Sequence, residues 1–548
     1  MPTTAPPTAP PTTPTTTPTT TPRTTRSIRP TIAAMSAPRH EDPQRVLPGQ
    51  RSWPLFGVAA SRAIEAGALA AHPGGLLMQR AGRAVARLAR ALAPHATHIW
   101  VAAGPGGNGG DGLHAAADLQ AAGAQVVVSL LADSARLSAD AQVGLQRARL
   151  AGVSFVDGAP TGRIDLAIDA LLGIGATRAP AGAMADQIDA INRCGAPCLA
   201  IDLPSGLNAD TGALLGDRVV RASATLALLT LKPGLFSAAG RDSAGAIWLD
   251  ALGIATDAQP LTAHLIGRET LAESPRSLRH DRHKGSFGDV IVVGGAPGMV
   301  GAARLAAHAA LGAGAGRTIV SLLDTSAAHE DASRPEWLWQ RAAWAPGACD
   351  LERSTVVCGC GGGDAVRAAL AALLSRSARL VLDADALNAV AADSALRRLL
   401  SARAGRGLHS ILTPHPLEAA RLLDSDTAAI QHDRLTAANA LARALGVIVV
   451  LKGSGTVIAA PDRAPAINPT GNASLASGGT GDVLAGWIAG AWSAGAAATD
   501  QSDADRAWRS ALASVWLHGA AAVAAGEIVV RALDLVDQMR AVAAEAAR

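Results

Sequence analysis

Cysteine is scarce in this sequence of 548 residues, and five copies are too few for the disulfide framework of a small secreted protein. Four of them form two close pairs, Cys194 with Cys198 and Cys358 with Cys360. These spacings do not make the repeated Cys-x2-Cys pattern of a zinc site. We therefore expect buried thiols in an intracellular, cytoplasmic protein.

An excess of charge of one sign is also missing. Lys and Arg number 48 and Asp and Glu 45, which gives a net charge of +3 and argues against a protein that binds nucleic acid through its charge. Apolar stretches such as residues 513–530 are interrupted by His518, Gly519 and Glu527, so we expect packed helices and no membrane span. The hydrophobic content of 49% is sufficient for sizeable cores, and the length predicts several globular units.

The first residues cannot build a core, because residues 2–22 contain only Pro, Thr and Ala. We expect residues 1–45 to be a disordered tail of polyproline character. Several arginines precede the first acid, Glu41, but no apolar segment makes this a secretory signal. Translation from Met35 is an alternative that would remove most of the tail.

Predicted strands and helices alternate in two series, which are separated by a charged break at residues 276–284. Alternation indicates mostly parallel sheets with binding sites at the carboxyl ends of the strands. We expect an α/β fold with two tandem three-layer domains, at residues 46–260 and 261–548. The expected strands are 98–103, 125–131, 165–172, 196–203, 289–294, 317–323, 354–358, 378–384, 409–412 and 447–451, and the first helices are 59–71, 76–92 and 113–122.

A glycine-rich loop at residues 104–112 follows a strand and precedes a helix. It contains Gly-x-Gly-x-x-Gly, with Asp133 near the end of the next strand, which is typical of a dinucleotide-binding fold. Asp111 argues against that reading, because a pyrophosphate at a helix start prefers bare N–H groups. The loop suits a cation or the hydroxyls of a ligand, and a simple strand-to-helix turn is the structural alternative.

Two further strands end in acids. Asp169 precedes a glycine-rich loop that runs into Arg178, and Asp202 is followed by Ser205. One such acid often caps a helix and does nothing more. Three polar strand ends at one edge of an open α/β sheet indicate a site.

Together these segments resemble the N-terminal domain of the NAD(P)HX epimerases over about residues 54–257. The resemblance rests on LMQRAG (77–82), GPGGNGGDG (104–112), DALLGIG (169–175) and DLPSGLNADTG (202–212). It implies a Rossmann-like domain that binds hydrated NADH or NADPH (NADHX, NADPHX) and a potassium ion. The family usually has Asn-Asn where this chain has Gly107-Asn108. The implied potassium ligands are Asn108, Asp169 and Ser205, the implied acid/base is Asp202, and the implied hydrate contacts are Gly107, Asn108, Gly109, Gly110, Asp111, Gly173, Ile174, Gly175, Ala176, Thr177, Arg178, Ala179 and Asp202.

In the second half, the segment 478–482 (GGTGD) precedes an apolar helix. Successive N–H groups of such a turn, together with the helix dipole, form an anion hole for a phosphoryl group. Asp482 at its end is placed to take a proton from an attacking hydroxyl. A flexible glycine loop is the alternative. No Gly-x4-Gly-Lys-Ser/Thr motif is present, so this is not a P-loop enzyme.

Three other segments follow predicted strands: 383–388 (DADALN), 413–418 (TPHPLE) and 452–456 (KGSGT). The last of these is suited to hold a nucleotide phosphate. Taken in isolation, His415 and Glu418 are more often a loop histidine and a helix-start carboxylate than metal ligands.

Together with HKGSFGDV (283–290) and GGAPGMVGAARLAA (294–307), these segments resemble the ribokinase-like superfamily over about residues 263–545. More narrowly, they resemble the ADP-dependent NAD(P)HX dehydratases, which implies ADP with a magnesium ion. The usual Gly-Pro-Gly-Leu-Gly segment reads Gly-Cys-Gly-Gly-Gly at residues 359–363, and loss of the proline is expected to loosen that loop. The implied hydrate contacts are Ala302, Gly363, His415 and Asp482, with Asp482 as catalytic base, and the implied nucleotide contacts are Lys452, Gly453, Ser454, Gly455, Thr456 and Gly481.

The two resemblances predict a bifunctional repair enzyme. It would epimerise R- and S-NAD(P)HX and dehydrate the S form to NAD(P)H at the expense of ADP. We expect a homo-oligomer whose partners are NADHX, NADPHX and ADP, with neither nucleic acid nor membrane. The alternative is a ribokinase-like small-molecule kinase with a non-catalytic N-terminal scaffold. The presence of Asp169 and Asp202 argues against a scaffold, and the KGSGT and TPHPLE segments argue against that kinase.

Overall fold

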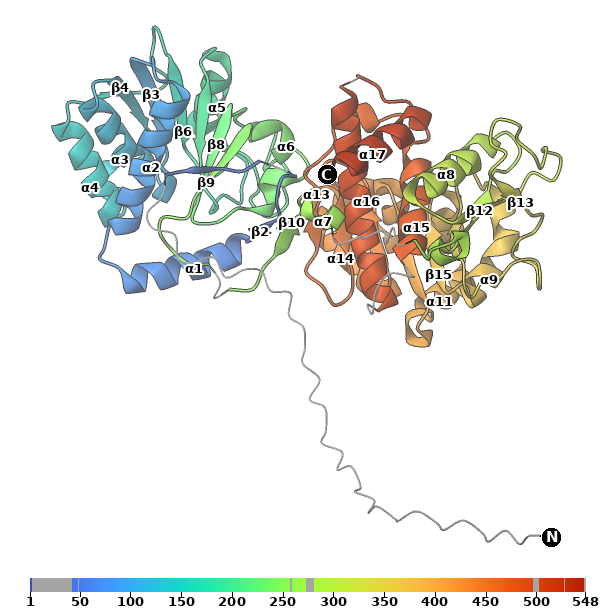
Figure 1. Ribbon diagram of the computed structural model, residues 1–548. Helices are drawn as coiled ribbons and strands as arrows, with labels where there is room; N and C mark the ends of the chain where they lie inside the picture. Colours follow the sequence, from blue (N-terminus) through green and yellow to red (C-terminus); the bar gives the residue numbers. More distant parts are fainter. Residues whose placement is uncertain are drawn as a thin grey trace.

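The computed structural model describes residue 1 and residues 42–546, apart from 48, 257–258, 273–279, 496–501 and 527. Most of the expected tail at 1–45 and part of the charged break at 276–284 lie outside the described residues. Two α/β units lie side by side, the first coloured blue to green and the second yellow to red (Figure 1). The expected fold class is confirmed.

The first sheet has eight strands in the order β1-β9-β8-β7-β6-β3-β4-β5, and only β1 runs antiparallel to its neighbour. From β3 the chain builds one side of the sheet and then returns to β6 on the other side. Ligands bind at such a reversal, outside the carboxyl ends of the strands. The strands are β1 Gln44–Arg45, β3 His98–Ala103, β4 Gln125–Leu130, β5 Ser154–Val156, β6 Leu166–Ala170, β7 Cys198–Ile201, β8 Ala224–Leu228 and β9 Ala246–Asp250.

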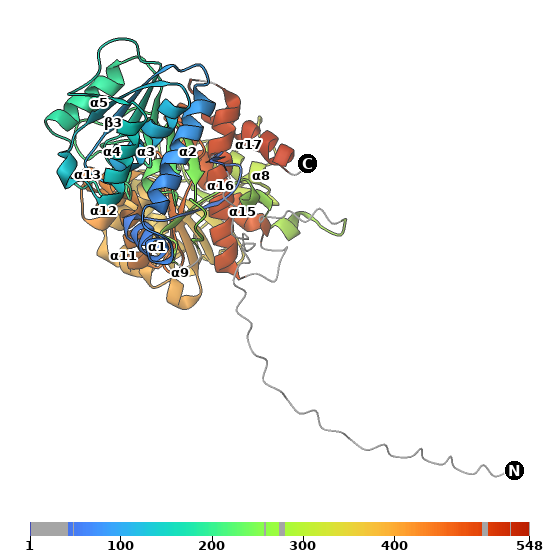
Figure 2. The ribbon, with the colours of Figure 1, turned by 90° about the vertical axis from the view of Figure 1, so that its left-hand side faces the viewer.

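Helices cover both faces of this sheet. Alternate residues of β3 point to opposite faces, so that Val101 packs in the core with α2, α3 and α4, while Trp100 packs with α5 (Figure 2). Helix α3 begins at Gly107, earlier than the expected start at 113, because the glycine-rich segment forms its first turn. The helices are α1 Val58–Ala71, α2 Leu76–Leu92, α3 Gly107–Ala121, α4 Ala139–Leu150, α5 Ala183–Arg193 and α6 Gly240–Ser243, with the short 3₁₀ turns η1 Ser134–Arg136 and η2 Pro233–Phe236.

The second sheet has eleven strands in the order β13-β12-β11-β14-β15-β16-β17-β18-β19-β10-β2. It is parallel from β13 to β17, and the chain again reverses direction across the sheet between β11 and β14. The strands are β2 Trp53–Leu55, β10 Ala263–Leu265, β11 Asp289–Gly294, β12 Arg317–Leu322, β13 Leu338–Trp339, β14 Thr355–Cys358, β15 Arg379–Leu382, β16 His409–Leu412, β17 Ile448–Leu451, β18 Val457–Ala459 and β19 Ala466–Ile467.

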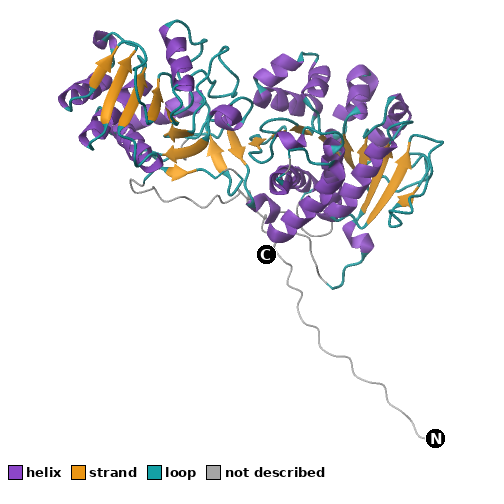
Figure 3. Cartoon of the chain, turned by 90° about the horizontal axis from the view of Figure 1, so that it is seen from above, coloured by secondary structure: helices purple, strands orange, loops and turns teal. Residues whose placement is uncertain are grey.

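Two groups of helices pack against this sheet, α8 with α15 to α17 in one core and α9 to α14 in the other. Figure 3 shows helices beside the strands of both units. Helix α15 packs very close to α8, since a Cβ on Gly486 would lie 2.1 Å from the Ala306 carbonyl oxygen. The helices are α7 Glu269–Ala272, α8 Val300–Ala313, α9 Arg367–Arg376, α10 Asp385–Ala392, α11 Ser394–Ser401, α12 Pro416–Leu423, α13 Thr427–His432, α14 Arg434–Leu445, α15 Thr480–Gly495, α16 Asp503–Ala525 and α17 Ala532–Ala546, with the 3₁₀ turns η3 Lys284–Phe287, η4 Asp364–Val366, η5 Ala404–Arg406 and η6 Ala473–Leu475.

The two units are joined by strand β2. It lies in the first half of the sequence but pairs antiparallel with β10 at the edge of the second sheet (Figure 1). Its Trp53 and Leu55 belong to one apolar core that also contains Phe236 of the first unit and Leu451 of the second. The units therefore share buried surface.

None of the helices in the part of the chain that the structure describes combines the length and hydropathy needed to cross a membrane. All five cysteines are free thiols, and Cys198, Cys358 and Cys360 are buried. Three of the four paired cysteines are thus buried as expected from the sequence, whereas Cys194 is only partly buried.

Candidate active sites

A cavity of about 570 Å³ opens at the carboxyl edge of the first sheet. It lies where the chain reverses between β3 and β6, and α1 and α2 contribute the rest of its wall. The expected site residues that line it are Gly107, Asn108, Asp111, Gly173, Ile174, Gly175, Ala176 and Asp202.

Other expected contacts lie elsewhere. Gly109 and Gly110 are buried inside the packing of α3, where a Cβ on Gly109 would lie 1.9 Å from the Gly104 carbonyl oxygen. Only glycine lets the helix begin so close to the end of β3. Thr177, Arg178 and Ala179 are not among the residues that line the cavity. Hydrate contacts at these positions stay predictions.

Asp202 forms a buried ion pair with Lys232 at the wall of the cavity. The Lys232 ammonium donates to the Asp202 carboxylate, to the Leu228 carbonyl at 2.8 Å and to the Thr230 carbonyl at 2.9 Å. All three of its N–H groups are therefore used. Asp202 has a left-handed backbone, with φ of 69°, which costs free energy for a residue other than glycine and is often found at functional sites.

Asp111 adds a second carboxylate to the same cavity. Burial, with Asp202 and Glu65 nearby, raises the pKa of Asp111 well above its ordinary value. The cavity thus holds an aspartate that is bound to a lysine and another that retains its proton more strongly than usual.

Behind the cavity, Asp169 and Ser205 meet at the end of β6. Asp169 is fully buried and accepts hydrogen bonds from the Ser205 hydroxyl at 2.6 Å and the Ser205 amide at 2.8 Å. The Ser205 Oγ accepts one from the Leu172 amide at 2.9 Å, and Asn108 Nδ2 donates to the Leu172 carbonyl at 2.9 Å. Of the three residues expected to bind potassium, Asn108 and Ser205 therefore bond to the backbone of Leu172, and Asp169 bonds to Ser205.

The Asp169 carboxylate has no positive partner among the residues that the structure describes. Burial raises the pKa of Asp169 to about 6, although the hydrogen bonds from Ser205 and Leu171 act in the opposite direction. A bound cation would supply the missing countercharge.

The edge of the second sheet holds another buried lysine–aspartate pair. Asp383, just after β15, accepts hydrogen bonds from Lys452 Nζ at 2.7 Å and from Thr413 Oγ1 at 2.8 Å. Burial lowers the pKa of Lys452, but Asp383 and Glu418 outweigh it and hold that pKa above its ordinary value. A Cβ on Gly481 would lie 3.4 Å from the Lys452 Nζ, so the ammonium lies directly beside the start of α15.

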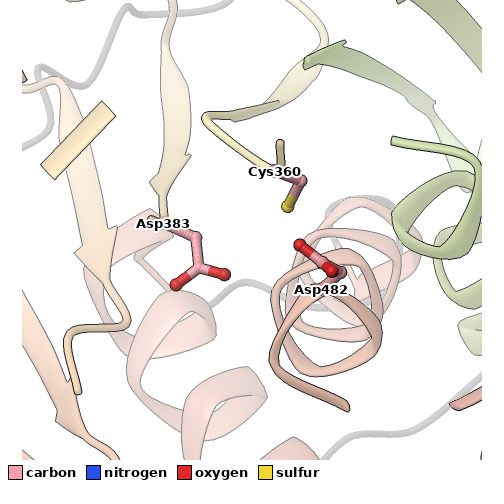
Figure 4. A group of neighbouring side chains, drawn as sticks. All are labelled: Cys360, Asp383 and Asp482. Carbon is pink, nitrogen blue, oxygen red and sulfur yellow. The ribbon is translucent and has the colours of Figure 1, made fainter. Parts of the chain in front are cut away.

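Asp482 lies in the first turn of α15, opposite Asp383 and Cys360 (Figure 4). One possible metal-ligand atom from each of the three residues lies within 4.8 Å of the others. Burial and the charge of Asp383 raise the pKa of Asp482 to about 6. Because Asp383 already binds the Lys452 ammonium, the cluster is better suited to proton transfer than to holding a metal ion.

The loop at 359–363 is held by hydrogen bonds and close packing, whereas the sequence predicted that loss of the proline would loosen it. Cys360 accepts a hydrogen bond from the Gly295 amide at 3.0 Å, and the Gly363 amide donates to Asp385 Oδ2 at 2.8 Å. A Cβ on Gly361 would lie 2.9 Å from the Ala302 Cβ, so the loop packs on the start of α8. Backbone hydrogen bonds and tight packing fix the loop without a proline.

His415 caps helix α12. Its Nδ1 accepts hydrogen bonds from the amides of Leu417 and Glu418 at 3.1 and 3.4 Å, and its Nε2 lies 3.1 Å from Glu418 Oε1. Of the two interpretations of His415 and Glu418, this geometry is that of a loop histidine with a helix-start carboxylate and not that of metal ligands. It places His415 next to Lys452, whose amide donates to the Pro414 carbonyl at 2.9 Å.

The loop at 452–456 is held from two sides. Arg434, which is 1% exposed, donates to the carbonyls of Leu451 and Lys452 at 3.0 Å each. From the first unit, the Ala238 amide donates to the Ser454 carbonyl at 3.2 Å. A Cβ on Gly455 would lie 2.3 Å from the Phe236 carbonyl oxygen. The first unit therefore forms part of the wall behind this loop.

Lys232 and Arg434 were not predicted from the sequence. A compositional signal for Lys232 exists, because only three of the 48 basic residues are lysines, namely Lys232, Lys284 and Lys452. Two of the three form the buried ion pairs of the two sites. Lysine presents a compact ammonium with three donors, whereas arginine presents a planar fork of five. Arg434 has no comparable signal, since arginine is common in this chain.

Known proteins resemble both halves of the chain. A family model described as "NAD(P)H-hydrate dehydratase" matches residues 290–539, and one described as "YjeF-related protein N-terminus" matches residues 74–234. A solved structure, the ADP/ATP-dependent NAD(P)H-hydrate dehydratase from Bacillus subtilis co-crystallised with ATP/Mg²⁺, is 26% identical. It covers 51% of this chain and 97% of its own, with a TM-score of 0.41.

Two curated relatives extend over both halves. The Bifunctional NAD(P)H-hydrate repair enzyme Nnr of Escherichia coli (strain K12) is 36% identical over 419 residues, which are 75% of this chain and 79% of that protein. The enzyme of the same name from Moorella thermoacetica is 35% identical over 507 residues, 85% of this chain and 91% of that protein. The chain is a member of the family of bifunctional NAD(P)H-hydrate repair enzymes.

Proposed function

We propose that residues 46–260 epimerise R- and S-NAD(P)HX and that residues 261–548, completed by β2, dehydrate S-NAD(P)HX with ADP. The observation that carries this proposal is that each sheet gathers, at its carboxyl edge, an aspartate bound to a buried lysine and a second, partly buried carboxyl group of raised pKa. Each edge can therefore move a proton. The expected homo-oligomer stays a prediction.

In the first unit, Asp202 is the acid/base. The hydrate carries its C6 hydroxyl beside the ring nitrogen, whose electron pair assists reversible cleavage of the C6–O bond. Asp202 lines the cavity and moves the proton of the departing and returning oxygen, while Lys232 holds its carboxylate in place. Asp111, with its raised pKa, is available as a proton donor on the same wall.

Potassium fits the group of oxygens behind this cavity. Carboxylate, hydroxyl and carbonyl oxygens are the ligands that hard cations prefer, and here Asp169, Ser205 and Leu172 supply one of each. Asn108 borders the same group through its contact with Leu172. When bound, the ion would neutralise the buried Asp169 carboxylate. The chain's own residues would then hold the loop at 172–176, which lines the cavity, in a fixed orientation.

In the second unit, Asp482 removes the proton of the C6 hydroxyl, whose oxygen attacks the β-phosphorus of ADP and releases AMP. The C6 phosphate ester then breaks with the electron pair of the ring nitrogen. That cleavage frees inorganic phosphate, and loss of a proton from C5 then completes the dihydronicotinamide. The amides at the start of α15 and the loop 452–456 hold the phosphates, and magnesium accompanies the nucleotide because it neutralises their charge.

The test is the near-ultraviolet absorbance of the dihydronicotinamide, followed after an epimeric mixture of NADHX meets the protein, ADP and magnesium. We expect full recovery that depends on ADP and is faster than spontaneous epimerisation. Recovery that stops at one epimer would remove the first activity. The absence of ADP-dependent recovery would remove the second and favour the ribokinase-like kinase.

A further inference from the structure

A thiol faces the proposed base of the second site. Cys360 follows β14, is fully buried, and points its sulfur toward the Asp482 carboxylate (Figure 4). The Cys360 sulfur and an Asp482 carboxylate oxygen lie within 4.8 Å of each other. In the dehydratase pattern described above, proline occupies this position, and a proline side chain has no donor.

The backbone of Cys360 cannot withdraw from this contact. Its carbonyl oxygen accepts the Gly295 amide at 3.0 Å, and a Cβ on Gly294 would lie 2.4 Å from that same oxygen. On the other side, a Cβ on Gly359 would lie 2.0 Å from the Asp383 carbonyl oxygen. The ends of β11 and β15 therefore fix the position of the Cys360 backbone.

A hydrogen bond between the two side chains would run from the thiol to the carboxylate. Burial and the neighbouring Asp482 raise the pKa of the Cys360 thiol well above its ordinary value, so the sulfur keeps its hydrogen and donates it. A hydrogen bond to the ionised form of a carboxyl group favours that form. Cys360 and Lys452 thus oppose burial, Asp383 and Asp385, which all favour protonation of Asp482. On the α16 side, His518 faces the carbonyl of Thr480 at 2.9 Å.

We propose that Cys360 is a positioning residue for dehydration, because its S–H group holds one oxygen of Asp482 and leaves the other free to take the hydroxyl proton. This inference rests on the proposed role of Asp482 as the base. It assigns to this chain a donor that the proline of the usual segment does not provide.

The test uses three variants of the full chain, Cys360→Ala, Cys360→Pro and Cys360→Ser, and the pH profile of kcat/KM for S-NADHX with ADP and magnesium. Alanine and proline remove the donor, and serine keeps one. Proline suits the backbone, because the Cys360 amide donates no hydrogen bond among the described residues. In the alanine and proline variants we expect the acidic limb of the profile to move up by about 0.5 pH unit. The value of kcat/KM then falls about twofold near pH 6 and does not change at pH 8. The serine variant should keep the limb.

A limb that stays in place in the alanine and proline variants would overturn the proposal, as would an equal shift in the serine variant. Thermal unfolding identifies a variant that does not fold. If either the alanine or the proline variant fails to fold, the acidic limb of the other one tests the proposal. Failure of the proposed function has a separate signature. If Asp482→Asn retained full dehydration, Asp482 would not be the base, whatever the Cys360 variants did.

Discussion

Both active sites contain the same kinds of residues, and they differ in the exposure of one aspartate. Each has a buried lysine–aspartate pair, Asp202 with Lys232 and Asp383 with Lys452. Each also has a further aspartate whose pKa burial raises to about 6, Asp169 in the first unit and Asp482 in the second. Asp169 is 0% exposed and surrounded by donors, whereas Asp482 is only partly buried at the start of α15.

In the proposed function, one kind of group serves two purposes. A carboxylate enclosed with hydroxyl and carbonyl oxygens cannot reach a substrate, and its charge calls for a cation. A carboxylate at a helix start, open on one side and opposed by another acid, is placed to accept a proton. Enclosure, more than pKa, distinguishes the two roles.

The largest expected effect separates the two activities. Asp482→Asn keeps the shape of the side chain but removes the base, so ADP-dependent dehydration should fall about 10³-fold while epimerisation stays unchanged. Rates of absorbance recovery, with each epimer resolved by chromatography, measure both activities. Asp364→Asn, at a fully exposed aspartate of η4, is the matched control and should change neither. A loss of both activities would point to misfolding.

The ion pairs can be broken next. Lys232→Met leaves Asp202 as a buried charge without its partner, and the free energy of unfolding should fall by about 3–5 kcal/mol. Urea unfolding followed by tryptophan fluorescence measures this loss. Adding Asp202→Asn to the same chain should restore much of the stability but not the epimerase activity. No recovery in the double variant would mean that Lys232 stabilises the fold in another way.

The enclosed carboxylate gives a smaller effect. Asp169→Asn should lower epimerisation about 10- to 100-fold and remove its dependence on potassium, because the ligand charge is lost. Dehydration by the second unit should continue at its normal rate. An epimerase that still responds to potassium after this substitution would exclude Asp169 as a ligand.

The smallest effect concerns stability and pH. Folding raises the pKa of Asp169 from 3.8 to about 6, so the folded state binds this proton more tightly than the unfolded state. The resulting stabilisation is complete below pH 3.8 and is lost as the pH rises through about 6. Potassium should therefore raise the unfolding temperature of the first unit by about 2–4 °C at pH 7.5 and much less at pH 5.

Choline chloride at equal ionic strength is the control for that measurement, because it cannot enter the site. Calorimetry in the two salts should agree for Asp169→Asn at both pH values. A potassium effect of equal size at pH 5 and pH 7.5 would contradict the raised pKa of Asp169 as its cause.

Much of the fold could be predicted, because buried parallel strands are short apolar runs followed by polar loops. The strands β3, β11 and β16 have the expected bounds. The start of α3 was predicted too late, since glycines usually interrupt helices and here they permit close packing at Gly104. Strand β2 could not be assigned to its sheet, because its partner β10 is distant in the sequence.

The sites were partly predictable for the same reason. Asp169, Asp202 and Asp482 stand next to strand ends or glycine turns, where the sequence marks them. Lys232 and Cys360 gain their importance only from partners that the topology brings to them, Asp202 and Asp482 respectively. Such contacts join residues that are distant in the sequence, so no local sequence pattern predicts them.

The sharing of β2 between the halves has a consequence for how the chain can be divided. A fragment beginning at residue 261 would leave β10 with an open edge of unpaired amides and carbonyls, a template for association with other chains. It would also lack Phe236 and Ala238, the backing of the loop at 452–456. The second activity therefore depends on residues that precede the second unit in the sequence. Dividing the chain between residues 260 and 261 would separate segments that pack together in the fold.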